Sequence, residues 1–285
     1  MNKLILMVAL LLFSENLLAQ AFLAEPNQPQ STNSVTIING SYTGKYDGNG
    51  NKTGYGKAIH ESGNSYEGEW KNDKRNRFGK ANFANGDRYE GNWLNDMRHG
   101  NGTYYFANGD KYVGEFVQDK IQGNGVYYYK NNNKYEGVFE DGRINGAGKA
   151  TYNNGDSYEG VFEHGKRTGP GKYFYRDGRV YEGKFNEDMK VDKGVLYFPD
   201  GSRYEGEFNN NERTGKGIYY YESGDKYEGG FLKGKFEGKG VYYFADGDKY
   251  VGEWKNGERN GNGTYYKANG EKIKKVYKYG IEQKN

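Results

Sequence analysis

The fold of this chain is decided by the stretch Tyr89-Glu90-Gly91-Asn92-Trp93 and by Gly102-Thr103-Tyr104-Tyr105-Phe106, which follows after a short polar segment. In both stretches, glycine or an aromatic residue occupies every second position. This period of two is typical of a β-strand with one buried face. The polar segment 94–99 predicts a turn, and Asn108-Gly109 predicts a second, tight turn. We therefore expect residues 89–111 to form a β-hairpin followed by a short link.

The same unit recurs ten times along the chain. Each copy begins with Tyr-x-Gly-x-aromatic; the first step between copies is 24 residues and the other eight are 23. The initial tyrosines are Tyr42, Tyr66, Tyr89, Tyr112, Tyr135, Tyr158, Tyr181, Tyr204, Tyr227 and Tyr250. A period of roughly 20 to 50 residues indicates a repeat array, in which each unit buries its apolar face against its neighbours. The glycine between the two aromatics predicts that a ring from an adjacent strand lies over the backbone.

Aromatic residues must supply most of the buried surface. The apolar fraction is only 34%, whereas the chain has 30 Tyr and 46 Gly among 285 residues. One buried aromatic side chain removes roughly 150 to 250 Å² from solvent, so a few per repeat can hold a thin layer together. The absence of Cys excludes disulfides, cysteine-dependent zinc sites and a thiol nucleophile. The net charge of +3 is close to balance, which argues against a nucleic-acid-binding protein.

The first two dozen residues differ from the repeats. Lys3 precedes an apolar run from Leu4 to Phe13, and Ala19-Gln20-Ala21 follows as a small-residue cleavage site. This order predicts a secretory signal peptide over residues 1–21, since a membrane-spanning helix needs about 20 apolar residues. An uncleaved N-terminal anchor is the alternative. Residues 22–40 are polar and contain proline, so we expect a linker there. The protein is therefore expected in the periplasm, at the cell surface or outside the cell.

The repeat unit resembles a known family. The runs Tyr66-Glu67-Gly68-Glu69-Trp70-Lys71-Asn72, Gly100-Asn101-Gly102-Thr103-Tyr104 and Asn108-Gly109-Asp110-Lys111-Tyr112 are similar to the MORN repeat (membrane occupation and recognition nexus). The resemblance covers about residues 42–280. It implies an all-β fold, an elongated single-layer antiparallel sheet of stacked β-hairpins built from ten 23-residue repeats. It also implies a scaffold or dimerising module, and membrane-lipid binding has been proposed for some members.

The array extends over residues 41–272, and residues 273–285 are expected to cap it. In this last segment Ile273 takes the tyrosine position and Lys275 takes the glycine position. Lys272, Lys274, Lys275 and Lys278 add positive charge. A terminal strand must protect its unpaired edge, and lysines do this. A basic docking site is the alternative interpretation.

On the second strand of seven hairpins, an aromatic residue occupies a position that the alternation assigns to solvent. The MORN pattern normally has a small polar residue there. These residues, which we name the outward aromatic line, are Tyr105, Tyr128, Phe174, Tyr197, Tyr220, Tyr243 and Tyr266. An exposed aromatic line predicts a binding surface for a protein partner, for a second copy of this chain or for the sugar rings of a polysaccharide. Alternatively, tyrosine is present only because it favours strands.

The first turn of each repeat, from the second repeat onward, carries a basic residue. These residues, which we name the basic edge, are Arg75, Arg98, Lys120, Arg143, Arg167, Lys190, Arg213, Lys235 and Arg259. Acidic residues lie beside many of them. The basic edge is a candidate site for anions or phospholipid headgroups, and a simply solvated row of turns is the alternative.

No arrangement of residues suggests catalysis. The three histidines, His60, His99 and His164, occupy three different repeat positions, and neither a Ser-His-Asp nor a metal-ligand spacing is present. We therefore expect a non-enzymatic protein with no cofactor, no metal and no nucleic-acid partner. The expected function is an exported scaffold for protein–protein interaction or envelope organisation, including self-association as a homodimer. The alternatives are a peripheral phospholipid-binding module and an extracellular glycan-binding rod.

Overall fold

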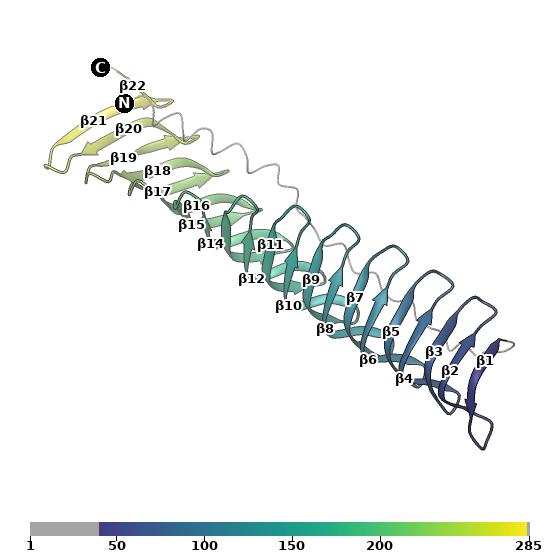
Figure 1. Ribbon diagram of the computed structural model, residues 1–285. Coiled ribbons are helices and arrows are strands. Elements are labelled where there is room, and N and C mark those ends of the chain that lie inside the picture. The colour runs from purple at the N-terminus through teal and green to yellow at the C-terminus, as the bar shows by residue number, and fades with distance from the viewer. Residues whose placement is uncertain (1–39, 284–285) are drawn as a thin grey trace. The chain divides into compact units, whose positions relative to one another are not determined.

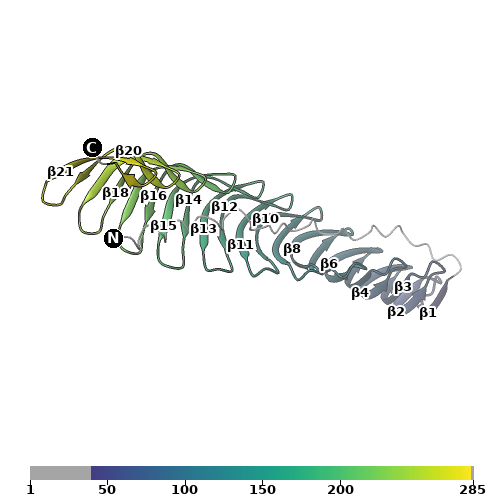
Figure 2. The ribbon, with the colours of Figure 1, turned by 90° about the horizontal axis from the view of Figure 1, so that it is seen from above.

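The computed structural model describes residues 40–283, so the predicted signal peptide and all but the last residue of the predicted linker lie outside the described residues. The chain divides between Lys166 and Arg167 into two compact units. We name them the N-terminal unit (residues 40–166) and the C-terminal unit (residues 167–283); the strand that begins at Lys166 is counted with the C-terminal unit. Figures 1 and 2 show that the strands of each unit follow one another in chain order. No helix within residues 40–283 is long and apolar enough to cross a membrane.

Every regular element of the described chain is a β-strand. The N-terminal unit contains β1 (Ser41–Tyr46), β2 (Lys52–Ile59), β3 (Ser65–Lys71), β4 (Lys74–Asn82), β5 (Arg88–Leu94), β6 (Met97–Tyr105), β7 (Lys111–Val117), β8 (Lys120–Tyr128), β9 (Lys134–Glu140), β10 (Arg143–Thr151) and β11 (Ser157–Glu163). The C-terminal unit contains β12 (Lys166–Phe174), β13 (Val180–Asn186), β14 (Met189–Tyr197), β15 (Arg203–Asn209), β16 (Glu212–Tyr220), β17 (Lys226–Leu232), β18 (Lys235–Tyr243), β19 (Lys249–Lys255), β20 (Glu258–Tyr266), β21 (Lys272–Lys278) and β22 (Ile281–Glu282). Consecutive strands pair antiparallel, so each unit is an open sheet of hairpins, as the sequence predicts.

The hairpin of β5 and β6 shows the pairing that the repeats share. Tyr89 lies opposite Tyr104 and Gly91 opposite Gly102, and the register then shifts so that Trp93 lies opposite Arg98. The same shift follows the glycine in β3, β7 and β15, and such a bulge bends the strand. The first turn is also shorter than predicted. Because β6 begins at Met97, Arg98 belongs to a strand and not to the turn predicted over residues 94–99.

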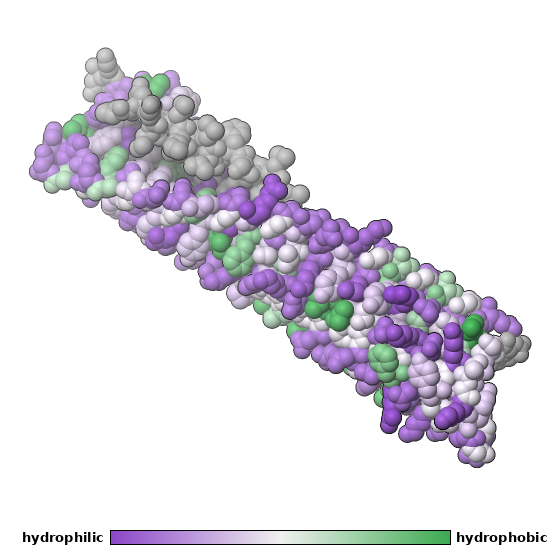
Figure 3. All heavy atoms as spheres, in the orientation of Figure 1, coloured by the Kyte–Doolittle hydropathy of each residue, from purple (hydrophilic) through white to green (hydrophobic). Residues whose placement is uncertain are grey.

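The inner face of each sheet, which we define as the face of the repeated tyrosines, holds an aromatic core. Tyr89 is 1% exposed and makes edge-to-face contacts with Trp93 and with Phe116 of the next repeat, both at a centroid distance of 5.1 Å. Tyr112 repeats this arrangement with Phe116 and Phe139. Each repeat is thereby joined to its neighbour through ring contacts that aromatic pairs prefer. On the face seen in Figure 3, hydrophilic residues predominate and apolar residues form only small, separate patches.

The ring of the first tyrosine of a repeat lies directly on glycine backbone, as Tyr89 shows. A Cβ placed on Gly102 would lie 2.4 Å from the hydroxyl of Tyr89 and 2.5 Å from its ring, and a Cβ on Gly91 would meet the same hydroxyl at 2.5 Å. The Tyr89 hydroxyl also donates a hydrogen bond to the carbonyl of Asn92 at 2.9 Å. The predicted role of the glycines is thus correct. The ring comes from the adjacent strand for Gly102, but from the same strand for Gly91.

In several repeats a carboxylate joins one closing turn to the next, a feature that the sequence analysis missed. The Asp87 side chain accepts hydrogen bonds from the Tyr104 hydroxyl and from the backbone N–H of Ala107, both at 2.7 Å. Asp110 repeats the arrangement one unit further on, and so does Asp225 in the C-terminal unit. These contacts hold consecutive turns at a fixed distance from one another.

Candidate functional site

Four residues of the predicted basic edge are buried in the inner face. Arg98 is 0% exposed, and the exposed fractions of Arg75, Arg167 and Arg213 are 7%, 5% and 4%. The prediction of an anion-binding role is wrong for these four, since a buried guanidinium group cannot meet a ligand at the surface. The sequence alternation indicates this burial. Arg98, Gly100, Gly102 and Tyr104 occupy every second position, so Arg98 is expected on the same face as the buried Tyr104.

Three of these arginines, Arg75, Arg98 and Arg167, clamp the turn of the following repeat through an aspartate, whereas Arg213 has Gly234 at that position. The Arg98 Nε lies 2.8 Å from Asp119 Oδ1, and its Nη2 donates to the Asp119 carbonyl at 3.2 Å. The Asp119 N–H donates in return to the Arg98 carbonyl at 3.0 Å. The guanidinium also lies 5.1 Å from the centre of the Tyr104 ring. Arg75 with Asp96 and Arg167 with Asp188 repeat this arrangement, so these residues stabilise the array.

Three other repeats fill the same positions with an apolar side chain and a glycine. Ile121 takes the place of Arg98 and Gly142 takes the place of Asp119; Ile144 with Gly165 and Phe236 with Gly257 are the other two pairs. The backbone hydrogen bond is unchanged, because the Gly142 N–H donates to the Ile121 carbonyl at 2.9 Å. The scaffold therefore accepts a charged pair or an apolar side chain above a glycine, and it also holds Arg213 above Gly234 and Arg259 above Gly280.

This alternation allows a direct test of the clamp. We expect Asp119→Gly to lower the free energy of unfolding by about 2 kcal/mol, since loss of the carboxylate leaves the buried Arg98 charge without its partner. The backbone partly offsets this loss, because Asp119 has a φ of 70° that glycine adopts freely. We expect Arg98→Ile combined with Asp119→Gly to restore most of the loss. Urea unfolding of the three proteins measures both effects. A double variant less stable than Asp119→Gly alone would contradict the clamp.

The remaining residues of the basic edge do not form a row. Lys120 and Arg143 are exposed, and Lys120 pairs with Asp141 at 2.8 Å. Lys190, Lys235 and Arg259 are half-buried. The Lys190 Nζ donates to the Tyr175 hydroxyl at 2.5 Å, and the Arg259 guanidinium lies over the Tyr250 ring at 4.8 Å. A continuous cationic edge is therefore absent from the described part of the chain.

The outward aromatic line lies on the outer face, opposite the aromatic core, and is interleaved with cations. Tyr128 and Tyr197 are 38% and 41% exposed, and the other five residues are half-buried. In the C-terminal unit, cross-strand neighbours alternate between an aromatic and a basic residue from Tyr197 to Lys272. The Arg203 guanidinium lies 3.8 Å from the centre of the Tyr220 ring, and the Lys226 ammonium lies 4.2 Å from that of Tyr243. We name this arrangement the aromatic–cation row.

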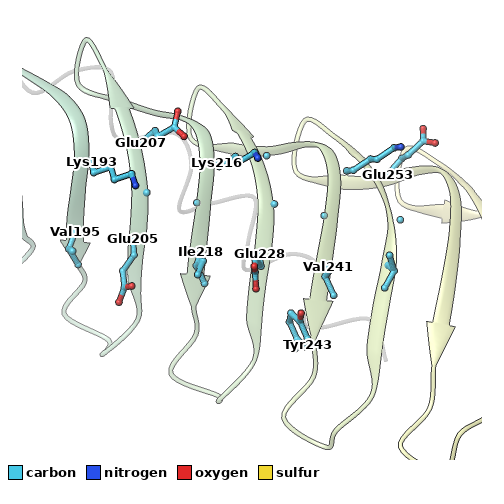
Figure 4. Close-up of a pocket in the computed structure, with 18 of the residues that line it drawn as sticks. Lys193, Val195, Glu205, Glu207, Lys216, Ile218, Glu228, Val241, Tyr243 and Glu253 are labelled. Atoms are coloured by element: carbon cyan, nitrogen blue, oxygen red, sulfur yellow. The ribbon is translucent and has the colours of Figure 1, made fainter.

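Beside this row, the outer face of the C-terminal unit contains a groove of about 1260 Å³, which we name the outer groove. Figure 4 shows two rows of side chains with glycine positions between them. One wall carries Val195, Ile218 and Val241 together with Glu205 and Glu228. The other wall carries Lys193, Glu207, Lys216, Lys239 and Glu253. The glycines of its floor are Gly194, Gly206, Gly217, Gly229, Gly240 and Gly252. Tyr243 of the aromatic–cation row also lines the groove.

The described residues offer binding surface and no assembled reactive group. Within residues 40–283, no cluster of three His, Cys, Asp or Glu side chains could hold a metal ion. Strongly raised pKa values belong to the core: burial raises the pKa of Tyr89 and Tyr112, and neither ring reaches the outer face.

Comparison with known proteins gives one strong match and several weak similarities. The family model of the MORN repeat matches residues 66–88, 89–111, 112–134, 135–157, 158–178, 181–203, 204–226, 227–249 and 250–272. These are nine of the ten predicted copies, and the first copy is not matched. No protein among the curated sequences matches this chain.

Three solved structures illustrate the weak similarities. The TCP domain of SAS-4 from Drosophila melanogaster, in complex with a proline-rich motif of Ana2, is 17% identical over 55% of this chain and 88% of that one, with a TM-score of 0.37. The TCP10 domain of CPAP from Danio rerio is 15% identical over 85% and 99%, with a TM-score of 0.34. Virginiamycin B lyase from Staphylococcus aureus is 12% identical over 84% and 89%, with a TM-score of 0.15. Similarities this low carry no argument about function.

Proposed function

Because the chain belongs to the MORN repeat family, we propose that it is an exported, non-catalytic scaffold that holds a protein partner on its outer face. The outer groove with its adjoining aromatic–cation row is the observation that carries this proposal. The inner face is filled by its own rings, so the outer face is the one that offers side chains to a partner. A concave, partly apolar surface bordered by aromatic and arginine side chains is typical of protein-binding sites.

Two other functions have less support. Binding of phospholipid headgroups would use the basic edge, four of whose nine residues are buried. Binding of a glycan by stacking would need free ring faces on the outward aromatic line. Cations lie over the rings of Tyr105, Tyr128, Tyr220, Tyr243 and Tyr266 instead.

Site-specific photo-crosslinking in the host cell tests the proposal. The photoreactive residue p-benzoylphenylalanine replaces Tyr243 inside the groove or, as a control, Leu94, which is 43% exposed at the end of β5. We expect a discrete crosslinked protein from the Tyr243 position and none from the Leu94 position. Crosslinking to a second copy of the chain would identify the partner as the protein itself. No crosslinked protein from position 243, or the same proteins from both positions, would overturn the proposal.

Two double variants sharpen the same experiment. We expect Tyr220→Thr with Tyr197→Thr to reduce the yield of the crosslink from position 243 at least tenfold. We expect Tyr46→Thr with Tyr55→Thr, which alters exposed tyrosines of the N-terminal unit, to leave the yield unchanged. Export rests on the sequence of residues 1–21, and the purified protein should begin at Phe22.

A further inference from the structure

The chemistry of the outer groove repeats at every second strand. Val195, Ile218 and Val241 occupy the same position of β14, β16 and β18, at intervals of 23 residues. Lys193, Lys216 and Lys239 occupy a second position of the same strands, across the glycine floor. Neighbouring strands lie about 4.8 Å apart, so two strands advance the groove by about 9.6 Å. A ligand that uses several repeats must present equivalent groups at this interval.

The two walls differ in charge. Lys193, Lys216 and Lys239 are exposed, and no salt bridge involves them in the described chain. Glu207 and Glu253 lie on the same wall as these lysines. On β17, between Lys216 and Lys239, the equivalent residue is Gly230, so no acidic side chain separates these two lysines. On the other wall, Glu182, Glu205 and Glu228 recur once per repeat. Glu205 and Glu228 pair with Arg203 and Lys226, and exposed pairs of this kind exchange partners at little cost.

One common backbone conformation matches the interval of the groove. A polyproline II helix has three residues per turn and a rise of 3.1 Å, so equivalent residues recur at about 9.3 Å. Seven residues of an α-helix span about 10.5 Å, and residues on one side of a β-strand recur at about 6.8 Å. Over three repeats, the polyproline II helix drifts by about 1 Å from the groove and the α-helix by about 3 Å.

The three sides of a polyproline II helix also match the three surfaces of the groove. We infer that the outer groove binds a polyproline II segment of a partner in which proline, an acidic residue and a basic residue recur every three positions. The inference rests on the proposed function. Prolines pack against the glycine floor and against Val195, Ile218 and Val241. The acidic column faces Lys216 and Lys239, and the basic column faces Glu205 and Glu228. Aromatic-bordered grooves are a recurring means of binding such helices, whose conformation is largely formed before binding.

Peptide binding to the full chain tests this inference. The probe is a fluorescent peptide of five Pro-Glu-Lys triplets, measured by anisotropy. The spacing control is a peptide of four Pro-Pro-Glu-Lys quartets, whose charges recur at about 12.4 Å in the same conformation. We expect the triplet peptide to bind at least tenfold more tightly than the quartet peptide. We expect Lys216→Glu with Lys239→Glu to weaken its binding at least tenfold. The matched control, Lys80→Glu with Lys149→Glu, changes two exposed lysines of the N-terminal unit and should leave binding unchanged.

Each contrary outcome overturns the inference in a recognisable way. Equal affinities for triplets and quartets would show that the groove does not select a three-residue period. No binding of either peptide, with the crosslink from position 243 intact, would overturn the inference and leave the proposed function standing. Loss of peptide binding together with loss of the crosslink would overturn the inference and the proposed function. Binding of polygalacturonate in place of the peptides, weakened by Lys216→Glu with Lys239→Glu, would assign the groove to an anionic glycan and overturn both proposals.

Discussion

Raising the pH above 10 is expected to unfold both units cooperatively within about one pH unit. Burial is the main cause that raises the pKa of at least six tyrosines in each unit, and it raises the pKa values of Tyr250 and Tyr265 to about 12. Ten more are Tyr66, Tyr89, Tyr104, Tyr112, Tyr129, Tyr135, Tyr204, Tyr221, Tyr227 and Tyr242. The fold therefore stabilises the neutral phenol and resists formation of the phenolate.

The sign of the effect follows from proton linkage. In the unfolded chain tyrosine titrates near pH 10, whereas the folded chain keeps these hydroxyls protonated above that pH. Between pH 10 and the folded pKa values, the unfolded state binds fewer protons, so stability falls as the pH rises. Each such tyrosine lowers the free energy of unfolding by about 1.4 kcal/mol per pH unit. Six in one unit lower it by about 8 kcal/mol per pH unit, which is comparable to the whole stability of an ordinary domain.

Two optical signals check this result. Absorbance at 295 nm follows tyrosinate formation, and far-ultraviolet circular dichroism follows the sheet. We expect both to change together and steeply, whereas N-acetyltyrosinamide titrates gradually around pH 10. Gradual ionisation up to pH 12 with an unchanged dichroism spectrum would show that the buried tyrosines do not control the stability of the fold.

The repeat allowed the hairpins to be predicted from the sequence almost residue by residue. The residue types of Tyr89, Gly91 and Trp93 each indicate their environment. An aromatic side chain is stabilised by burial, and a position beneath a ring has no room for a Cβ. Ten copies in register average out local ambiguity. The aromatic core and the pairing of strands into hairpins are therefore predictable from the sequence.

The polar residues were less predictable, because charge alone does not say whether a side chain is solvated. Arg98 was assigned to a turn, although its parity with Tyr104 places it inward. Its burial depends on Asp119, which lies 21 residues away in the next repeat. Asp87 and Asp110 likewise act on the turn of the following repeat. The outer groove could not be predicted either, since the concavity depends on how the strands bend at their glycines and bulges.

Gly102→Ala is expected to destabilise the N-terminal unit by about 3 kcal/mol or more, because it overpacks a filled core. The new Cβ would lie within 2.6 Å of three atoms of the Tyr89 side chain, two of them in the ring and the third its hydroxyl oxygen. That ring cannot move aside, since Trp93 and Phe116 contact it and its hydroxyl is bonded to the Asn92 carbonyl. Urea unfolding and hydrogen exchange of residues 89–111 measure the loss. Gly48→Ala is the matched control, because no atom lies within 4 Å of the added Cβ there.

A double-mutant cycle isolates the cause of this effect. Tyr89→Ala removes the ring and is itself destabilising, by about 3 to 5 kcal/mol. If the clash with the ring explains the cost of Gly102→Ala, the same substitution in the Tyr89→Ala protein should cost less than about 1 kcal/mol, a coupling typical of residues in direct contact. An unchanged cost in that background would mean that the glycine is required by the backbone and not by the ring. Because other repeats, among them those of Tyr112 and Tyr204, place their tyrosine on a facing glycine pair in the same way, the outcome at this one hairpin explains why glycine recurs in them as well.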